Sequence, residues 1–299
     1  MSLIIEVENV CKRYGDKQAL QGVNFSLNQG APVALVGPNG AGKTTLFSLL
    51  CGYIQPTSGS IKILGHKPAN SALFGRLSAL PQDAQLDPRF SIARQLTFYA
   101  RLQGMSKKLA LKDTQRVIAM VGLEDAANSR PSELSHGMRK RATIAQALLG
   151  APEIVMLDEA TAGLDPINAK EIRAIVAEHA NDVNFILSSH DLSELERLCD
   201  QVLYLESGQL KQHTDLNSKE SNRFITLRMK QEYPEFLPSL MAMQGVTHVT
   251  VTQDREYLLS IDTQQNTVAI EIALLTMLDK NSWLYAQLIN GKTLENQLF

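Results

Sequence analysis

Cysteine is scarce in this sequence, and neither sign of charge dominates. Cys11, Cys51 and Cys199 stand 40 and 148 residues apart, so no paired spacing indicates a zinc site or a disulfide framework, and a reducing cytoplasm fits. The 29 Lys and Arg residues nearly balance 31 Asp and Glu residues, for a net charge of −2. Because this balance gives no overall attraction to nucleic acid or anionic lipid, we expect local phosphate binding and no nucleic acid partner.

Long hydrophobic runs are also missing. Glu6 and Glu8 interrupt the first ten residues, which argues against a signal peptide. The apolar stretch 270–278 contains Glu271 and is far shorter than the ~20 residues that a membrane-spanning helix needs. With 44% hydrophobic and 20% charged residues, the composition is that of an ordinary globular protein. The 299 residues favour two domains, since one domain takes roughly 150 residues.

The order of expected elements predicts a mixed α/β first domain. Alternating residues predict an antiparallel pair of strands at 3–7 and 23–27, followed by a strand at 32–36 that leads into a glycine-rich loop and a helix. A helical pattern then runs from 92 to 149, and we assign a helical subdomain to about 90–150. Strands and helices alternate again from 154 onward, the rhythm of a parallel sheet.

A polar stretch at 211–222 predicts a linker, which we place near residue 218. Beyond it, the order strand, helix, strand, strand, helix, strand between 224 and 288 suggests a small α+β ferredoxin-like domain. We therefore predict a first domain of residues 1–217 and a second of 218–299, which carries no catalytic signature and is expected to be regulatory or to mediate contacts.

A phosphate-binding loop is predicted between the strand at 32–36 and the helix after it. The segment 37–45 reads GPNGAGKTT and matches the P-loop spacing of Gly, four residues, Gly-Lys-Ser/Thr. An incidental glycine-rich turn is the alternative, which the strand and helix on either side disfavour. Lys43 would neutralise the β and γ phosphates, the Thr44 hydroxyl would ligate Mg²⁺, and Thr45 would support the α phosphate. The predicted phosphate-binding residues are Gly37, Asn39, Gly40, Gly42, Lys43, Thr44 and Thr45.

Two further strands end in polar residues. The apolar run 154–157 ends in Asp158 and Glu159, where Asp158 could hold Mg²⁺ through water and Glu159 could polarise the water that attacks the γ phosphate. The run 185–187 leads to His190, which could contact the γ phosphate at the same edge of the sheet. A solvated strand end and an ordinary surface histidine are the alternatives.

A third motif gives these residues a family context. Residues 134–138 read LSHGM, lie shortly before the acidic strand and open a predicted helix. The run resembles the signature of ATP-binding cassette proteins, whose commonest form is Leu-Ser-Gly-Gly-Gln. It departs from that form at His136 and Met138 but keeps Ser135 and Gly137, the two residues that approach phosphate in the family. Residues 1–217 resemble, in the order and spacing of their motifs, the nucleotide-binding subunit of ATP-binding cassette transporters.

The resemblance implies the fold and several more residue roles. The expected fold class is α/β, a P-loop ATPase core with an antiparallel β subdomain and a helical subdomain. Tyr14 would stack on adenine, although it could merely pack a hairpin turn. Gln82 would contact Mg²⁺ and the γ phosphate and sense the membrane partner. Asp165 would reach across a dimer, although an ordinary helix cap explains it as well. Ser135 and Gly137 would meet the phosphate held by a second copy.

The function that we predict is Mg²⁺-dependent ATP hydrolysis by an ATP-dependent homodimer that drives a separate integral-membrane permease. The chain would be cytoplasmic and peripheral on the inner face of the cell membrane, and its aromatic residues Phe90, Phe98 and Tyr99 would line a groove for a permease helix or belong to the core. Export is favoured by the tail 293–299, which resembles the ends of some exporter subunits.

Two other functions compete with this prediction. A soluble cassette ATPase could act as a conformational switch on a macromolecule. However, Ser135 lies only 92 residues after Lys43, which leaves no room for a long coiled coil. A nucleotide sensor without hydrolysis is disfavoured because Glu159 and His190 are both present.

Overall fold

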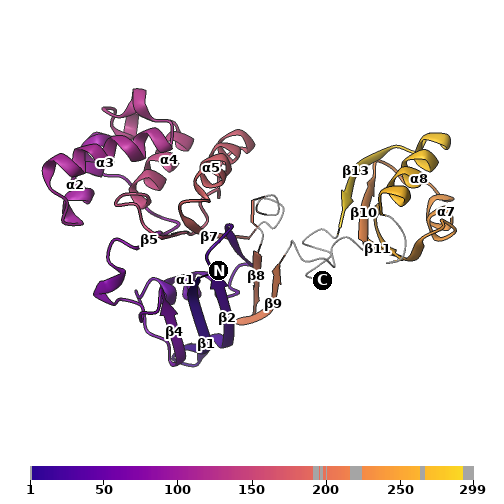
Figure 1. Ribbon diagram of the computed structural model, residues 1–299, viewed down its shortest axis with the longest axis horizontal. Coiled ribbons are helices and arrows are strands. Elements are labelled where there is room, and N and C mark those ends of the chain that lie inside the picture. The colour runs from indigo at the N-terminus through magenta and orange to yellow at the C-terminus, as the bar shows by residue number, and fades with distance from the viewer. Residues whose placement is uncertain are drawn as a thin grey trace. The chain divides into compact units, whose positions relative to one another are not determined.

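The computed structural model describes residues 2–190, 195, 198–199, 201–215, 224–262 and 267–291. The chain divides into two compact units, residues 1–214 and 215–299 (Figure 1). Each unit has its own cluster of buried hydrophobic side chains. The predicted linker position near 218, the tail 293–299 and most of the helix predicted at 192–198 lie outside the described residues.

Three antiparallel strands form the first layer of the first unit, in the order β2-β1-β4. They are β1 (Leu3–Tyr14), β2 (Lys17–Asn28) and β4 (Ser58–Ile63). The predicted antiparallel pair is confirmed, and it extends to the tight turn between Tyr14 and Lys17. Strand β4 was missed by the sequence prediction because its first three residues are polar and exposed and only Ile61 and Ile63 are buried.

A six-stranded sheet forms the second layer, in the order β5-β6-β7-β3-β8-β9. Its strands are β3 (Val33–Val36), β5 (Leu77–Leu80), β6 (Ile154–Leu157), β7 (Asn184–Ser189), β8 (Gln201–Glu206) and β9 (Gln209–Asp215). The pairs among β5, β6, β7, β3 and β8 are all parallel. Strand β9 corrects the sequence prediction, which assigned most of it to a polar linker. Since β3, β6 and β7 run parallel, the residues that follow them meet at one edge of the sheet.

The predicted helical block consists of α2 (Ile92–Leu102), α3 (Lys107–Met120) and α4 (His136–Ala147). Figure 1 shows it grouped apart from the antiparallel strands, with α5 (Pro166–His179) beside α4. Capping fixes two helix starts, because the side chain of Ser106 accepts from the backbone N–H of Leu109 at the start of α3, and Asp165 caps α5 just before Pro166.

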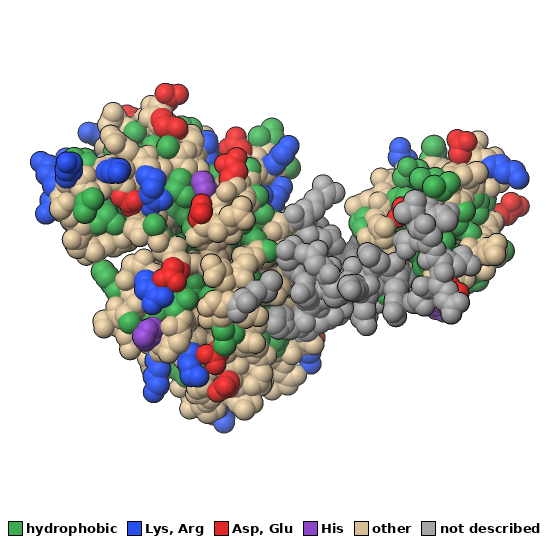
Figure 2. Space-filling model, viewed as in Figure 1, with side chains coloured by type: hydrophobic (Ala, Val, Ile, Leu, Met, Phe, Trp, Pro, Cys, Tyr) green, Lys and Arg blue, Asp and Glu red, His purple; other side chains and the backbone are tan. Residues whose placement is uncertain are grey.

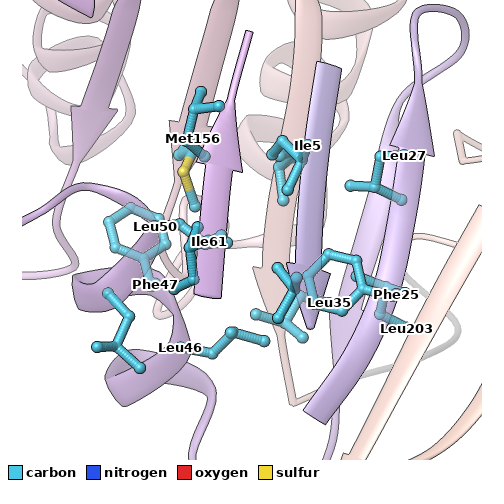
Figure 3. Close-up of a cluster of buried hydrophobic side chains, with 14 of the residues drawn as sticks. Ile5, Phe25, Leu27, Leu35, Leu46, Phe47, Leu50, Ile61, Met156 and Leu203 are labelled. Atoms are coloured by element: carbon cyan, nitrogen blue, oxygen red, sulfur yellow. The ribbon is translucent and has the colours of Figure 1, made fainter. Parts of the chain in front are cut away.

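One hydrophobic cluster joins the two layers of strands to α1 (Lys43–Leu50). Figure 3 shows Leu46, Phe47 and Leu50 of α1 close to Ile61 of β4 and Met156 of β6. All five side chains are buried. Because α1 begins directly at the glycine-rich loop, this packing fixes the position of the loop relative to both sheets.

The second unit is a four-stranded antiparallel sheet with two helices. Its sheet has the order β11-β12-β10-β13, and its elements follow one another in the predicted order. They are β10 (Phe224–Met229), α7 (Phe236–Met241), β11 (Val246–Gln253), β12 (Glu256–Ile261), α8 (Thr267–Lys280) and β13 (Tyr285–Asn290). Phe236 lies in the core, where its ring meets Tyr257 and Trp283 edge to face at centroid distances of 4.9 and 5.3 Å.

The separate cores predict that the second unit can be destabilised alone. Phe236→Ala should lower its free energy of unfolding by about 3 to 5 kcal/mol, because the substitution leaves a cavity among aromatic rings. The fluorescence of Trp283, the single tryptophan of the chain, would report this unfolding in a urea titration. Met241→Ala is the control, since Met241 is 57% exposed. A loss of ATP binding along with the unfolding of the second unit would contradict the independence of the cores.

Candidate functional site

The glycine-rich loop wraps around the amine of Lys43. Gly37 has φ +153°, and a Cβ there would lie 2.0 Å from the carbonyl oxygen of Leu205, so only glycine fits. Lys43 is 7% exposed, and its Nζ donates to the carbonyl oxygens of Gly37 and Pro38 at 2.7 and 3.3 Å. The loop therefore holds a buried cation beside the first turn of α1, where backbone N–H groups have no partner within the helix.

A serine joins the two carboxylates that follow β6. Ser188, near the end of β7, donates its hydroxyl hydrogen to Oδ1 of Asp158. The same Ser188 oxygen accepts a hydrogen bond from the backbone N–H of Glu159 at 2.9 Å. Glu159 adopts φ +50°, a conformation that costs a non-glycine residue about 1 to 3 kcal/mol and that clusters at functional sites. The serine thus helps to hold the chain in the turn that presents Glu159.

Glu159 lies between a histidine and the lysine of the loop. Its Oε2 is 2.8 Å from Nδ1 of His190, and its Oε1 is 4.0 Å from Nζ of Lys43. The three residues come from the ends of β6 and β7 and from the start of α1. The structure therefore brings together Lys43, Glu159 and His190, three of the side chains that were predicted from the sequence to act at the γ phosphate.

Burial shifts the pKa values of three charged groups around this site. Burial raises the pKa of Asp158, and the hydrogen bond from Ser188 opposes that rise. Burial lowers the pKa of Lys43, while Glu159 and Asp158 favour its charged form. Lys140 of α4 follows the same pattern, with its pKa lowered by burial and supported by the same two carboxylates. Each charge in the group is thus stabilised by an opposite charge nearby.

A cavity of about 580 Å³ opens beside these residues. The start of β2 contributes Lys17 and Gln18, and the turn between β8 and β9 contributes Ser207 and Gly208. None of these four residues was predicted from the sequence. Neither Gly37 nor Asp158 lines the cavity; Asp158 is only 2% exposed. The predicted residues that do line it are Tyr14, Asn39, Gly40, Gly42, Lys43, Thr44, Thr45, Gln82, Glu159 and His190.

The signature residues Ser135 and Gly137 lie away from this cavity. Ser135 caps α4 by accepting a hydrogen bond from Met138 N at 3.1 Å, and a Cβ at Gly137 would lie 1.8 Å from the side-chain oxygen of Asn168. Asp165 caps α5, and hydrogen bonds from Asn168 and Ile167 lower its pKa. None of the three predicted residues Ser135, Gly137 and Asp165 lines the 580 Å³ cavity.

A second cavity, of about 410 Å³, lies between the first cavity and α4. It shares Gln82, Glu159 and Ala162 with the first, and α4 contributes His136, Arg139, Lys140 and Thr143. No role was predicted from the sequence for Ser188 or Lys140. The sequence does contain a signal for each residue. Ser188 follows the same apolar run that leads to His190, and Lys140 lies one helical turn after His136.

Comparisons with known proteins identify the family. A family model described as ABC transporter matches residues 20–162. An uncharacterized ABC transporter ATP-binding protein of Bacillus subtilis, YxlF, is 33% identical over 84% of this chain and 85% of its own. Nod factor export ATP-binding protein I of Burkholderia orbicola is 36% identical over 68% of each chain. A dimeric structure of a bacterial ABC transporter cassette matches with a TM-score of 0.64 and 25% identity, covering 72% of this chain and all of that one.

The relatives and the fold agree with the site geometry. The family model spans the glycine-rich loop, the signature residues and the acidic end of β6. The structural match covers 72% of the chain, which is about the length of the first unit. The chain therefore belongs to the ABC transporter family, as one of its ATP-binding and ATP-hydrolysing proteins.

Proposed function

We propose that this chain hydrolyses Mg-ATP with Glu159 as the general base and, as an ATP-assembled dimer, drives a separate membrane permease. The observation that carries the proposal is the position of Glu159, which lies at the cavity wall between His190 and the buried Lys43. A carboxylate held by a histidine beside a phosphate-binding loop can accept a proton from water as that water attacks the γ phosphate.

The other cavity residues would bind different parts of the nucleotide. Lys43 can exchange the carbonyl oxygens of Gly37 and Pro38 for the β and γ phosphate oxygens, which offer its charge a stronger partner. The backbone N–H groups of Asn39 and Gly40 and the first turn of α1, with Thr45, would hold the remaining phosphate oxygens. Tyr14, half exposed at the cavity rim, would stack on adenine.

Mg²⁺ fits the oxygen donors that are available here. The Thr44 hydroxyl and the Gln82 side-chain oxygen at the cavity are hard ligands of the kind that Mg²⁺ takes together with substrate phosphates. The Asp158 carboxylate, which does not line the cavity, would hold the ion through a water molecule. The described part of the chain holds no group of three or more His, Cys, Asp or Glu side chains that could bind a metal alone. When bound, the ion would neutralise charge on the phosphates.

Substitutions of Lys43 and Glu159 should separate binding from hydrolysis. Lys43→Ala should weaken ATP binding at least about tenfold, because a charge-assisted hydrogen bond is lost. Glu159→Gln should bind ATP with near wild-type affinity and lose about 100-fold or more in turnover, because the amide keeps the shape without the base. Phosphate release and equilibrium binding would be measured with and without Mg²⁺. Lys62→Ala, an exposed lysine of β4, is the control, and wild-type turnover in Glu159→Gln would contradict the role of Glu159.

Dimerisation would complete the site. Ser135 and Gly137 at the start of α4 and Asp165 at the start of α5 lie apart from the nucleotide cavity of their own chain. A second copy in two-fold arrangement could present them to the γ phosphate, which the positive end of α4 would favour. The dimeric structure of a related cassette supports this arrangement.

ATP should therefore assemble the dimer, and its hydrolysis should loosen it. Light scattering of Glu159→Gln should give a dimer with Mg-ATP and a monomer with ADP. Adding Ser135→Arg should abolish the ATP dimer, because a bulky cation replaces the capping hydroxyl at the contact. Ser58→Arg, at an exposed position of β4, should leave it intact. A monomer in every state, or a dimer that tolerates Ser135→Arg, would contradict the composite site.

The permease would bind at the helical block. A cavity of about 260 Å³ there is lined by β5 and α2 together with Phe74 and Gln146. Tyr99 lines it, and Phe98 meets the Tyr99 ring edge to face at 5.8 Å, whereas Phe90 is not among its lining residues. The aromatic groove supports docking of a short amphipathic helix. No helix in the described residues is itself long and apolar enough to span a bilayer.

Membrane purification tests the partner. The tagged chain should co-purify from detergent-solubilised membranes with a multi-helix membrane protein, and Phe74→Glu should lose it, because the exposed Phe74 ring would be replaced by a charge. Leu3→Glu, at another exposed apolar position, is the control. Capture of ribosomes or DNA-repair proteins without a membrane protein would contradict the proposal.

A permease partner would place the chain at the inner face of the cell membrane. The relative named for Nod factor export supports export as the direction of transport. The second unit has a hydrophobic core of its own. This independence supports a role for the second unit in regulation or in contacts with the dimer partner or the permease.

A further inference from the structure

The hairpin formed by α2 and α3 carries an uneven distribution of charge. Residues 88–112 contain six Lys and Arg residues and no Asp or Glu, in a chain whose net charge is −2. Four of the six surround the turn between the helices, and all four are exposed. They are Arg101, Lys107, Lys108 and Lys112.

Exposed leucines lie among these basic residues. Leu102 is 62% exposed, Leu109 58% and Leu111 47%, although each helix buries a different apolar face, including Leu96 of α2 and Val117 of α3. Packing within the hairpin therefore does not need these leucines. We call Arg101, Leu102, Lys107, Lys108, Leu109, Leu111 and Lys112 the hairpin tip. Figure 2 shows Lys and Arg side chains with hydrophobic ones between them over the α2 and α3 end of the first unit.

In the part of the chain that the structure describes, no carboxylate neutralises the basic side chains of the hairpin tip through an ion pair. Within the described residues, none of the four forms an ion pair. The nearest acidic residue in the sequence, Asp113, pairs instead with Arg116 at 2.7 Å. The hairpin tip therefore presents uncompensated positive charge together with apolar surface.

We propose that the hairpin tip binds the anionic headgroups of a lipid bilayer, with its leucines entering the boundary between headgroups and acyl chains. Basic residues are attracted to the negative surface potential of such a membrane, and interspersed apolar side chains add burial that a phosphate polymer cannot offer. Nucleic acid fits less well, because single strands are held by aromatic stacking and the hairpin tip contains no aromatic residue.

The position of the hairpin tip agrees with this partner. Leu102 also lines the groove assigned above to the permease, so the two surfaces adjoin, and in this respect the inference rests on the proposed function. Lipid binding itself needs no permease. The hairpin tip would steer the chain to the membrane surface and orient the groove toward an integral-membrane partner.

The full-length protein can be tested with vesicles that contain no protein. Flotation would compare pure phosphatidylcholine with phosphatidylcholine containing about a quarter phosphatidylglycerol, at about 0.1 and 0.5 M salt. Binding should require the anionic lipid and weaken with salt. Each basic side chain near such a surface strengthens binding about fivefold, so Lys107→Gln/Lys108→Gln/Lys112→Gln should bind about a hundredfold more weakly.

Two matched variants separate charge from apolar contact. Lys67→Gln/Lys170→Gln/Lys230→Gln removes three exposed lysines elsewhere and should bind anionic vesicles like the wild type. Leu109→Gln/Leu111→Gln should bind more weakly at both salt concentrations, because it keeps the charges and loses the insertion. ATP hydrolysis by the triple hairpin-tip variant without vesicles should equal that of the wild type, which separates failure of this inference from failure of the proposed site.

Three results would overturn the inference. The first is equal binding to both kinds of vesicle or to neither. The second is unchanged vesicle binding by the triple hairpin-tip variant. The third is loss of binding to a labelled RNA or DNA oligonucleotide in that variant while vesicle binding persists, which would assign the surface to nucleic acid.

Discussion

Lys43, Asp158 and Glu159 are buried at one edge of the parallel sheet, although water would solvate each of their charges better than an apolar interior. They are tolerated there because they compensate one another and because Ser188 and the carbonyl oxygens of the loop supply hydrogen bonds. The same arrangement leaves Lys43 bonded to weak acceptors and Glu159 in a strained backbone conformation. A phosphate offers the amine a better partner, so the stability of this buried group and its readiness for nucleotide have one physical origin.

The hydrophobic cluster beneath the site makes this arrangement rigid. Leu46 and Phe47 of α1 pack against side chains from both layers of strands, so α1 cannot shift without opening a close-packed core. The loop before α1 and the ends of β6 and β7 therefore keep their spacing. Because the glycine-rich loop is already held in place, it loses little conformational entropy when it binds nucleotide, which favours affinity.

The parts of the site that the sequence predicted are those whose geometry is local. Gly37 to Thr45 form one loop, and the continuous apolar run of β6 fixes where Asp158 and Glu159 emerge. The order of strands and helices in the second unit was also predicted from the sequence. Strand β4 was not predicted because its polar residues pair with β1, which is distant in the sequence. Strand β9 was not predicted because most of its residues are polar, although it pairs with β8 directly before it in the sequence. The role of Ser188 was not predicted because it depends on β7 lying beside β6 and not on the residues next to Ser188 in the sequence.

One short segment lines the nucleotide cavity, the cavity beside α4 and the groove at the helical block. Residues Ser78 to Leu80 of β5 line the groove at the helical block, Gln82 lines the nucleotide cavity, and the residues from Gln82 to Leu86 line the cavity beside α4. Strand β5 pairs with β6, which carries Asp158 and Glu159 at its end. Under the proposed function, a change in the contacts of Gln82 when the γ phosphate is lost would shift the walls of all three cavities. An element that contacts both sites can carry energetic coupling between the nucleotide and a partner at the groove. Within the described residues, this segment joins the two sites with the fewest intervening residues.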